Sequence, residues 1–177
     1  MNRAEGTLSW SPAADHPEHL APAVVSSLPL APSARVAVID PTLADTAAFC
    51  EAYDSAPEHS ANCVVVAGKR NGELRYAAVV VLASSRADVN GVVRRHLDVR
   101  KISFAPQEDA VALTGMEFGG ITPVGLPDGW PVLVDEAVVA AGQVVIGSGI
   151  RASKLVVDAS ELAALPTAEV LALAQGS

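Results

Sequence analysis

Apolar residues along the chain fall into short strand-like runs separated by segments with helical spacing. Runs rich in Val, Ile, Leu and Ala are typical of strands that pack on a core. They predict strands at residues 35–39, 62–67, 73–83, 101–104, 132–134, 144–147 and 154–157. Apolar positions at helical spacing, together with Pro or Thr near the start, predict helices at residues 17–28, 42–53, 88–97, 106–113 and 135–141 and helical turns at 159–165 and 167–174.

Two of these strands are joined by a short turn. Asn71 and Gly72 stand between them, and this dipeptide is typical of a tight β-hairpin. The second strand is apolar at every position from 77 to 82, which predicts that both of its faces are covered. Direct strand pairing combined with strand–helix alternation indicates the α/β class (mixed α+β), with a mixed β-sheet flanked by helices.

The composition is that of a single domain with a core of small side chains. The chain has 177 residues, half of them hydrophobic, and is rich in Ala and Val. Residues 1–15 mix Gly, Ser, Pro and Ala around Trp10, and we interpret them as an N-terminal extension that Trp10 anchors. Residues 16–177 then form the domain. Aromatic residues are scarce, which disfavours a base-stacking platform for single-stranded nucleic acid.

The charge is distributed unevenly. A formal net charge of −8 argues against a protein that coats nucleic acid through bulk electrostatics. The segment from Lys69 to Lys101, however, carries eight basic and three acidic residues. Two interpretations are open for this basic stripe, namely a contact with an RNA backbone or a solvated helix face with hairpin tips.

Several classes of site and location are disfavoured. Cys50 and Cys63 lie thirteen positions apart, which is neither a redox nor a zinc spacing. His16 and His19 lack a third convergent ligand in the sequence, so no metal and no cofactor is expected. The N-terminus has no signal pattern and no run is long enough to span a membrane. We expect a cytoplasmic protein without membrane contact.

The stretch from Gly115 to Pro131 is too rich in glycine and proline for a helix interior or a central strand. It is either a structural turn or a ligand loop in which the amides near Gly119 and Gly120 face an oxygen of the ligand. Trp130 is expected to cover this loop or pack on it.

Three segments carry a family resemblance. Residues 113–127 contain the Gly-x-x-x-Pro signature from Gly119 to Pro123, residues 132–135 follow it, and residues 145–151 contain Gly147-Ser148-Gly149. Together they resemble the YbaK/EbsC and prolyl-tRNA synthetase insertion-domain family, from about Thr42 to Leu162. The resemblance implies an aminoacyl-tRNA deacylase whose mixed sheet curls towards a barrel. It also implies tRNA as a partner, and we consider an aminoacyl-tRNA synthetase as a second one.

The resemblance also assigns site residues. Asn62 occupies the position of the family's lysine, and Gly119 and Gly120 are expected to hold the reacting ester with main-chain amides. No catalytic triad is apparent, so the substrate's own ribose hydroxyl is expected to help activate water. The remaining predicted substrate-binding residues are Ile121, Thr122, Pro123, Gly147, Ser148, Gly149 and Arg151.

Some roles stay open. Lysine carries a full positive charge, whereas the Asn62 amide is uncharged. Lys69 lies about 23 Å further along the strand, which is too far to supply the missing charge. Lys154 and Arg151 are the candidates for a compensating charge. Ser148 is interpreted as an orienting donor rather than a nucleophile, and Thr122 either lines the pocket or caps a turn. The alternatives to a deacylase are a binding module of the same fold and a hydrolase of small acyl esters.

Overall fold

The computed structural model describes residues 3–175. Its strands are β1 (Ser11–Pro12), β2 (Arg35–Val38), β3 (Ala61–Arg70), β4 (Glu73–Leu82), β5 (Lys101–Phe104), β6 (Val132–Asp135), β7 (Gln143–Gly147), β8 (Ser153–Asp158) and β9 (Ala168–Leu171). The α-helices are α1 (Pro22–Ser27), α2 (Thr46–Tyr53), α3 (Arg94–His96), α4 (Gln107–Thr114), α5 (Glu136–Ala140) and α6 (Ala159–Ala163). A π-turn, η6 (Val89–Val93), precedes α3, and short 3-10 turns include η2 (Pro17–His19).

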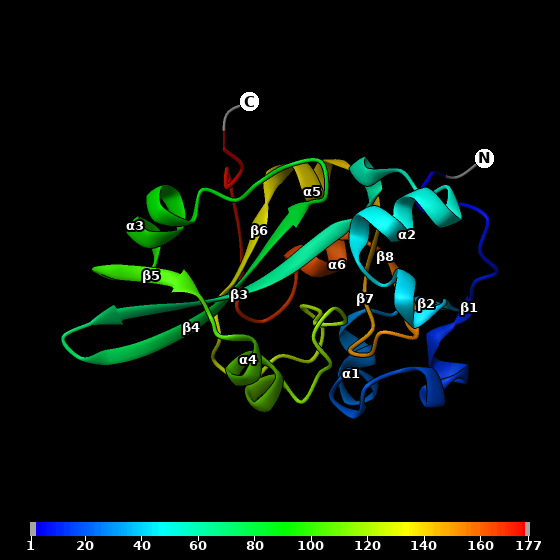
Figure 1. Ribbon diagram of the computed structural model, residues 1–177, viewed down its shortest axis with the longest axis horizontal. Helices are drawn as coiled ribbons and strands as arrows, with labels where there is room; N and C mark the ends of the chain where they lie inside the picture. Colours follow the sequence, from blue (N-terminus) through cyan, green and yellow to red (C-terminus); the bar gives the residue numbers. More distant parts are fainter. Residues whose placement is uncertain (1–2, 176–177) are drawn as a thin grey trace.

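The strands form two separate sheets (Figure 1). One has the order β1-β2-β8-β7 and is antiparallel. The other has the order β5-β3-β4-β6-β9 and is mixed, because β6 pairs in parallel with both β4 and β9. The predicted mixed α/β fold is therefore confirmed, but the expected barrel is not, since neither sheet closes on itself. An isolated bridge from Ser60 to Val145 connects the sheets beside the start of β3.

Strand β4 lies at the centre of the core. Its residues Ala78, Val80 and Leu82 pack into a large apolar cluster that includes β7 and β8. The alternate residues Ala77, Val79 and Val81 pack into a second cluster beneath η6. Because successive side chains of a strand point to opposite faces, both faces of β4 are buried, as its continuous apolar run predicts.

The last element differs from its prediction. We expected helical turns at residues 167–174, because Ala, Glu and Leu favour helix. The structure has strand β9 there, paired with β6 from Val132↔Ala168 to Asp135↔Leu171. Strand β6 would otherwise leave its hydrogen-bonding edge exposed, and Leu173 is fully buried in the second cluster. Long-range pairing and burial therefore override the local propensity.

Residues 3–15 lie on the domain. Ala4 is fully buried, and the Ala56 N–H donates to Arg3 O at 2.8 Å. Trp10 packs against the cluster that contains Phe49, and its indole N–H donates to Glu5 O at 3.0 Å. These contacts hold the segment against α2 and the residues after it.

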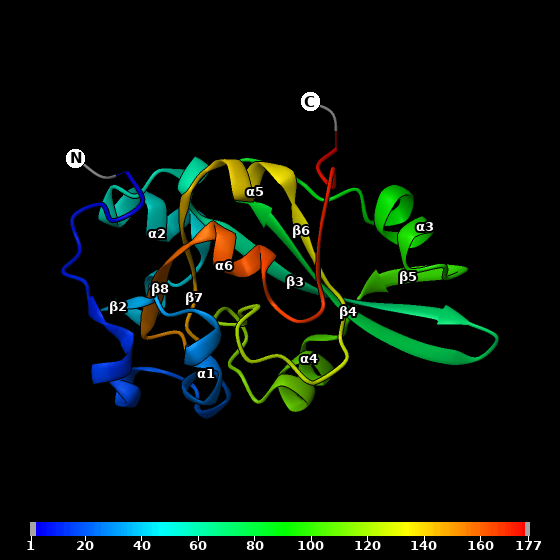
Figure 2. The same cartoon turned by 180° about the vertical axis from the view of Figure 1, so that it is seen from behind.

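Strands β3 and β4 continue past the rest of the sheet as a long hairpin. In Figure 1 this hairpin projects from the body at the end where β5 and α3 lie. Seen from behind in Figure 2, α5 and α6 lie together on the body, away from the hairpin tip. Within residues 3–175, no helix combines the length and apolar character that a bilayer crossing requires.

Candidate active site

A cavity of about 1180 Å³ opens between the two sheets and α2. Its walls come from α2 and the residues just before it, the first half of β3, the segment after β5, the glycine-rich loop, and strands β7 and β8. Residues that line it include Asp45, Thr46, Phe49, Cys50, Asn62, Cys63, Val65, Phe104, Ala105, Phe118, Gly119, Ile121, Gly147 and Lys154. Four of the residues predicted for the site, Asn62, Gly119, Ile121 and Gly147, therefore meet in one cavity.

Asn62 lies near the start of β3 and is partly exposed to the cavity. Its Oδ1 accepts a hydrogen bond of 2.5 Å from Thr46 Oγ1 at the beginning of α2. This contact occupies the amide oxygen of Asn62, so the side-chain NH₂ group is the part left to act as a donor. Asn62 brings no charge to the cavity.

Lys154 supplies a positive charge to the same cavity from β8. Its side chain is largely buried, its Nζ donates to Ala44 O at 2.9 Å, and it lies 5.4 Å from the centroid of the Phe49 ring. The pKa of Lys154 is lowered to about 8, mainly because the amine is buried. Cys50 and Asp45 oppose this shift by favouring the charged amine, and the positive charge of Arg151 adds to it. The amine is therefore mostly protonated at neutral pH.

The glycine loop and the Gly-Ser-Gly turn pack main chain to main chain. A Cβ atom at Gly147 would lie 2.5 Å from Gly120 O, and one at Gly120 would lie 2.7 Å from Ile150 O. The Gly149 N–H donates to Gly120 O at 2.7 Å. The absence of side chains at these positions is thus a steric requirement of the contact between the two loops.

The main-chain amides of Gly119 and Gly120, which were both expected to face a ligand, have different surroundings. The Gly120 N–H donates to Glu117 O at 2.9 Å, so the loop itself uses this donor, and Gly120 is buried outside the cavity lining. Gly119 is exposed, lines the cavity and has a φ of +91°. Of the pair, only Gly119 therefore lies at the cavity surface.

Arg151 braces the loop rather than lining the cavity. Its main-chain N–H donates to Glu117 Oε1 at 2.7 Å, and its guanidinium donates to Phe118 O at 3.2 Å and to Pro41 O at 3.1 Å. These bonds connect the glycine loop to the segment before α2. Arg151 thus positions two walls of the cavity relative to each other.

The other predicted residues lie beneath the loop. Ser148 is fully buried, and its hydroxyl shares hydrogen bonds with Ile150 O and with Ser153. Thr122 is fully buried too, and its Oγ1 has no hydrogen-bond partner within the described residues. Pro123 and Gly149 are also buried, and none of these four residues lines the cavity.

Comparison with known proteins assigns the family. Residues 40–165 match the aminoacyl-tRNA editing domain family. The chain belongs to this family. The match confirms the predicted resemblance and supports aminoacyl-tRNA deacylation as the function. No functionally curated protein matches the chain.

Solved structures show that the fold is shared. A candidate trans-editing enzyme for prolyl tRNA synthetase is 23% identical with a TM-score of 0.74, and the match covers 95% of this chain and 100% of that one. The hypothetical protein APE2540 is 22% identical with a TM-score of 0.71, over 80% of this chain and 91% of its own. At these identities the similarity is one of fold.

Several residues of the editing-domain cavity were not identified from the sequence, and three of them lie on one helix. Thr46, Phe49 and Cys50 belong to α2, whose sequence carries no motif that indicates a site. Burial raises the pKa of the Cys50 thiol, and it raises the pKa of the Cys63 thiol to about 12. Both cysteines are therefore protonated at neutral pH and unsuited to act as nucleophiles.

Two residues of the glycine-rich loop lie outside the cavity lining. Trp130 stacks on Tyr76, with ring centroids 5.3 Å apart, and neither residue lines the cavity. Glu117 accepts a hydrogen bond from the Arg151 main-chain N–H through its carboxylate. Both residues therefore hold the loop rather than form part of the pocket.

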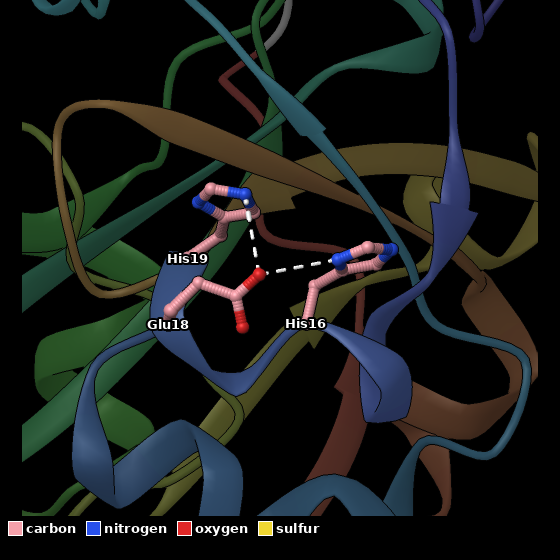
Figure 3. A group of neighbouring side chains, drawn as sticks. All are labelled: His16, Glu18 and His19. Atoms are coloured by element: carbon pink, nitrogen blue, oxygen red, sulfur yellow. Dashed lines mark hydrogen bonds and ion pairs between the residues drawn. The ribbon is translucent and has the colours of Figure 1, made fainter.

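A cluster of potential metal ligands lies outside the cavity (Figure 3). His16 Nδ1 and His19 Nε2 lie 3.2 Å and 3.5 Å from the same oxygen of Glu18, and the two rings stack at 5.8 Å. The expectation that no third ligand converges here was wrong, because η2 turns Glu18 between the histidines. The side chains are partly exposed, and their mutual contacts account for the arrangement.

Proposed function

We propose that the cavity between α2, β3 and β8 hydrolyses the ester of an aminoacyl-tRNA. In this proposal Lys154 takes the role of the family's lysine, whose position Asn62 occupies. The observation that carries this proposal is the convergence of Lys154 and Asn62 on one cavity from different sheets. A lysine on β8 thereby provides the charge that β3 does not.

The reaction needs stabilisation of a developing negative charge. Water attacks the ester carbon and gives up a proton, while the carbonyl oxygen becomes an oxyanion. When the oxyanion re-forms the carbonyl, the bond to the ribose oxygen breaks and that oxygen takes up the proton released by the water. The Lys154 ammonium has three donors, of which Ala44 O uses one. The remaining donors and the Gly119 amide face the oxyanion, while the Asn62 NH₂ group orients the acyl group.

The size of the cavity favours a substrate larger than an amino acid. Its volume of about 1180 Å³ exceeds the range of about 300–1,000 Å³ that is usual for small-ligand pockets. The terminal adenosine and the attached aminoacyl group together fit this space. By analogy with the candidate trans-editing enzyme for prolyl tRNA synthetase, a mischarged tRNA for proline is the substrate to test first, with that synthetase as a partner.

Hydrolysis of a panel of mischarged tRNAs by the purified protein tests the proposal. We expect turnover of at least one ester among alanyl, seryl, cysteinyl and prolyl tRNA. Inactivity on all four, in a protein that is folded by circular dichroism, would reject the deacylase. Loss of that turnover in Lys154→Gln but not in Arg86→Gln would assign the charge to Lys154.

A binding module of the same fold is the second candidate, and the uncharged Asn62 favours it. Asn62→Lys separates the two functions. In a deacylase that already uses Lys154, a second ammonium in the cavity changes the rate or the preferred amino acid. In a binding module, it creates turnover where the parent protein has none. The parent rate measured beside the variant decides between these outcomes.

A further inference from the structure

A second hollow, of about 490 Å³, lies at the projecting end of β3. It is lined by Lys69, Arg70, Asn71, Arg100 and Lys101, so four of its five residues are basic. Lys69 and Lys101 face each other across the β3–β5 pairing. The hollow therefore concentrates positive charge on a chain whose net charge is −8.

The charges of this basic groove are only partly neutralised. Arg70 forms an ion pair with Asp98 and also donates to its main-chain oxygen. Within residues 3–175, Lys69, Arg100 and Lys101 form no salt bridge, and all three are exposed. A groove with unpaired, exposed cations is suited to the phosphates of a nucleic acid backbone.

An open surface connects this groove to the cavity. In the antiparallel pair β3–β5, Lys69 lies opposite Lys101 and Ala67 lies opposite Ser103. One step further, the Ala105 N–H donates to Val65 O at 2.9 Å, and both of these residues line the cavity. Alternate residues of a strand share a face, so these three pairs form one continuous path.

The side chains in the middle of this path are small and accessible to solvent. Ala67 is partly exposed and Ser103 is exposed, and neither side chain is large enough to block a bound strand. From Val65 to Lys69 the path is about 13 Å long at ~3.3 Å per residue. An RNA whose end lies in the cavity therefore reaches the groove with phosphates that precede its terminal nucleoside.

We propose that the face of the β3–β5 ribbon formed by Lys69, Ala67, Lys101 and Ser103 binds the acceptor arm of tRNA, with backbone phosphates in the basic groove. This inference rests on the proposed function, because the cavity must hold the aminoacyl end. The ribbon provides affinity for RNA in general, and the cavity recognises the ester. The face is accessible, because Lys69, Lys101 and Ser103 are exposed and Ala67 is partly exposed.

Binding of uncharged tRNA tests the inference without requiring the chemistry. We expect Lys69→Ala/Lys101→Ala to raise the Kd at least about tenfold at low salt. The slope of log K against log salt concentration should also fall by about 2, since each lost phosphate contact removes about one unit. Both side chains are exposed, so the variant is expected to keep the thermal unfolding midpoint of the parent protein.

Arg86→Ala/Arg95→Ala is the matched control, because it removes the same charge from exposed residues outside the groove. We expect this control to keep the salt slope of the parent protein. Equal weakening in the two double variants, or no measurable binding of tRNA by the parent, would overturn the inference.

A second measurement separates this inference from the proposed function. Hydrolysis of an aminoacyl-adenosine, which is too short to reach the groove, should be the same in the groove variant and the parent. If the parent hydrolyses this compound but the groove variant binds tRNA normally, the groove is rejected and the deacylase stands. If the parent binds tRNA through the groove but hydrolyses no ester, the deacylase is rejected and the RNA surface stands.

Discussion

The cavity and the basic groove use lysine in opposite ways. Lys154 is buried, fixed by Ala44 O and placed against the Phe49 ring, so burial lowers its pKa to about 8. Lys69 and Lys101 are exposed at the end of a hairpin and have no fixed partner among residues 3–175. In our proposals, the first lysine acts through its fixed position beside the substrate, and the other two act through the number of charges they present.

This difference indicates how each region tolerates change. A buried cation interacts strongly because the surrounding dielectric is low, and it depends on every group that holds it in place. Exposed cations are screened by salt and interchangeable with one another. We therefore expect single substitutions to disable the cavity, whereas the groove responds gradually to charge and to salt.

Replacing the buried lysine should have the largest effect. Lys154→Met keeps most of the side-chain volume but removes the ammonium that faces the oxyanion. We expect kcat for a mischarged tRNA to fall by about 10²–10³-fold, the usual effect of losing one oxyanion donor. Single-turnover hydrolysis measures this effect, with Arg86→Met as the exposed control that should retain the parent rate.

The same lysine should make stability depend on pH. Its pKa is lower in the folded protein than the ordinary 10.5, so between pH 8 and 10.5 the unfolded chain binds more protons than the folded one. Stability therefore rises across this window, by about 3 kcal/mol for a shift of this size. Below pH 8 the folded protein carries the full free-energy cost of burying the protonated Lys154 amine.

Urea unfolding at several pH values checks this sign. The free energy of unfolding of the parent protein should increase relative to that of Lys154→Met as the pH rises from 8 to 10.5. The cysteines of the unfolded chain also titrate in this range, but they are common to both proteins and largely cancel in the difference. A constant difference across the window would show that burial does not perturb this amine.

Replacing a glycine by alanine should destabilise the protein more beside the cavity than at the hairpin turn near the basic groove. Gly147→Ala places a Cβ against two main-chain oxygens, those of Gly120 and Ile121, at 2.5 Å and 2.8 Å. We expect a loss of about 2–3 kcal/mol in stability, as for overpacking in a rigid site. Gly72→Ala at the hairpin turn meets no atom within 4 Å and is expected to cost about 1 kcal/mol, from its φ of +79°. Equal losses would contradict the close packing of the two loops.

The smallest effect is expected at the hydrogen bond that holds Asn62. Thr46→Val removes the donor to Asn62 Oδ1 and keeps the shape of the side chain. We expect a loss of about 1 kcal/mol in stability, together with a raised KM on the mischarged tRNA, because the Asn62 amide is then free to rotate. Thr7→Val, which removes a bond on the exposed N-terminal segment, should leave KM unchanged.

Periodicity and turn signals predicted most elements, and they were wrong at the C-terminal end. The sequence predicts the β3–β4 hairpin from Asn71-Gly72 and the double burial of β4 from its apolar run, and both predictions are confirmed. It does not predict β9, because that strand is stabilised by pairing with β6 rather than by its own residues. The expected curl of the sheet towards a barrel is not confirmed for a related reason: it depends on how sheet edges meet in space.

Within the cavity, the sequence indicated the glycine loop and left the source of the charge open. It singled out Gly119 and Gly147; the main-chain contact with Gly120 explains why position 147 is glycine, and a φ of +91° beside the Arg151 guanidinium explains why position 119 is. It also identified the loss of lysine at position 62, and it offered Lys154 and Arg151 as substitutes. The structure separates these two, because Lys154 lines the cavity and Arg151 binds main-chain oxygens of the surrounding walls.

The sequence by itself thus determined the local features of this protein: its strands and hairpin, the two glycine turns, the family, and the basic segment within an acidic chain. These follow from neighbouring residues, whose propensities and spacing act over a few positions. Only the tertiary structure decided which lysine enters the cavity and that an open ribbon connects the cavity to the basic groove. Both depend on strands that are distant in the chain and become neighbours only through packing and hydrogen bonding between them.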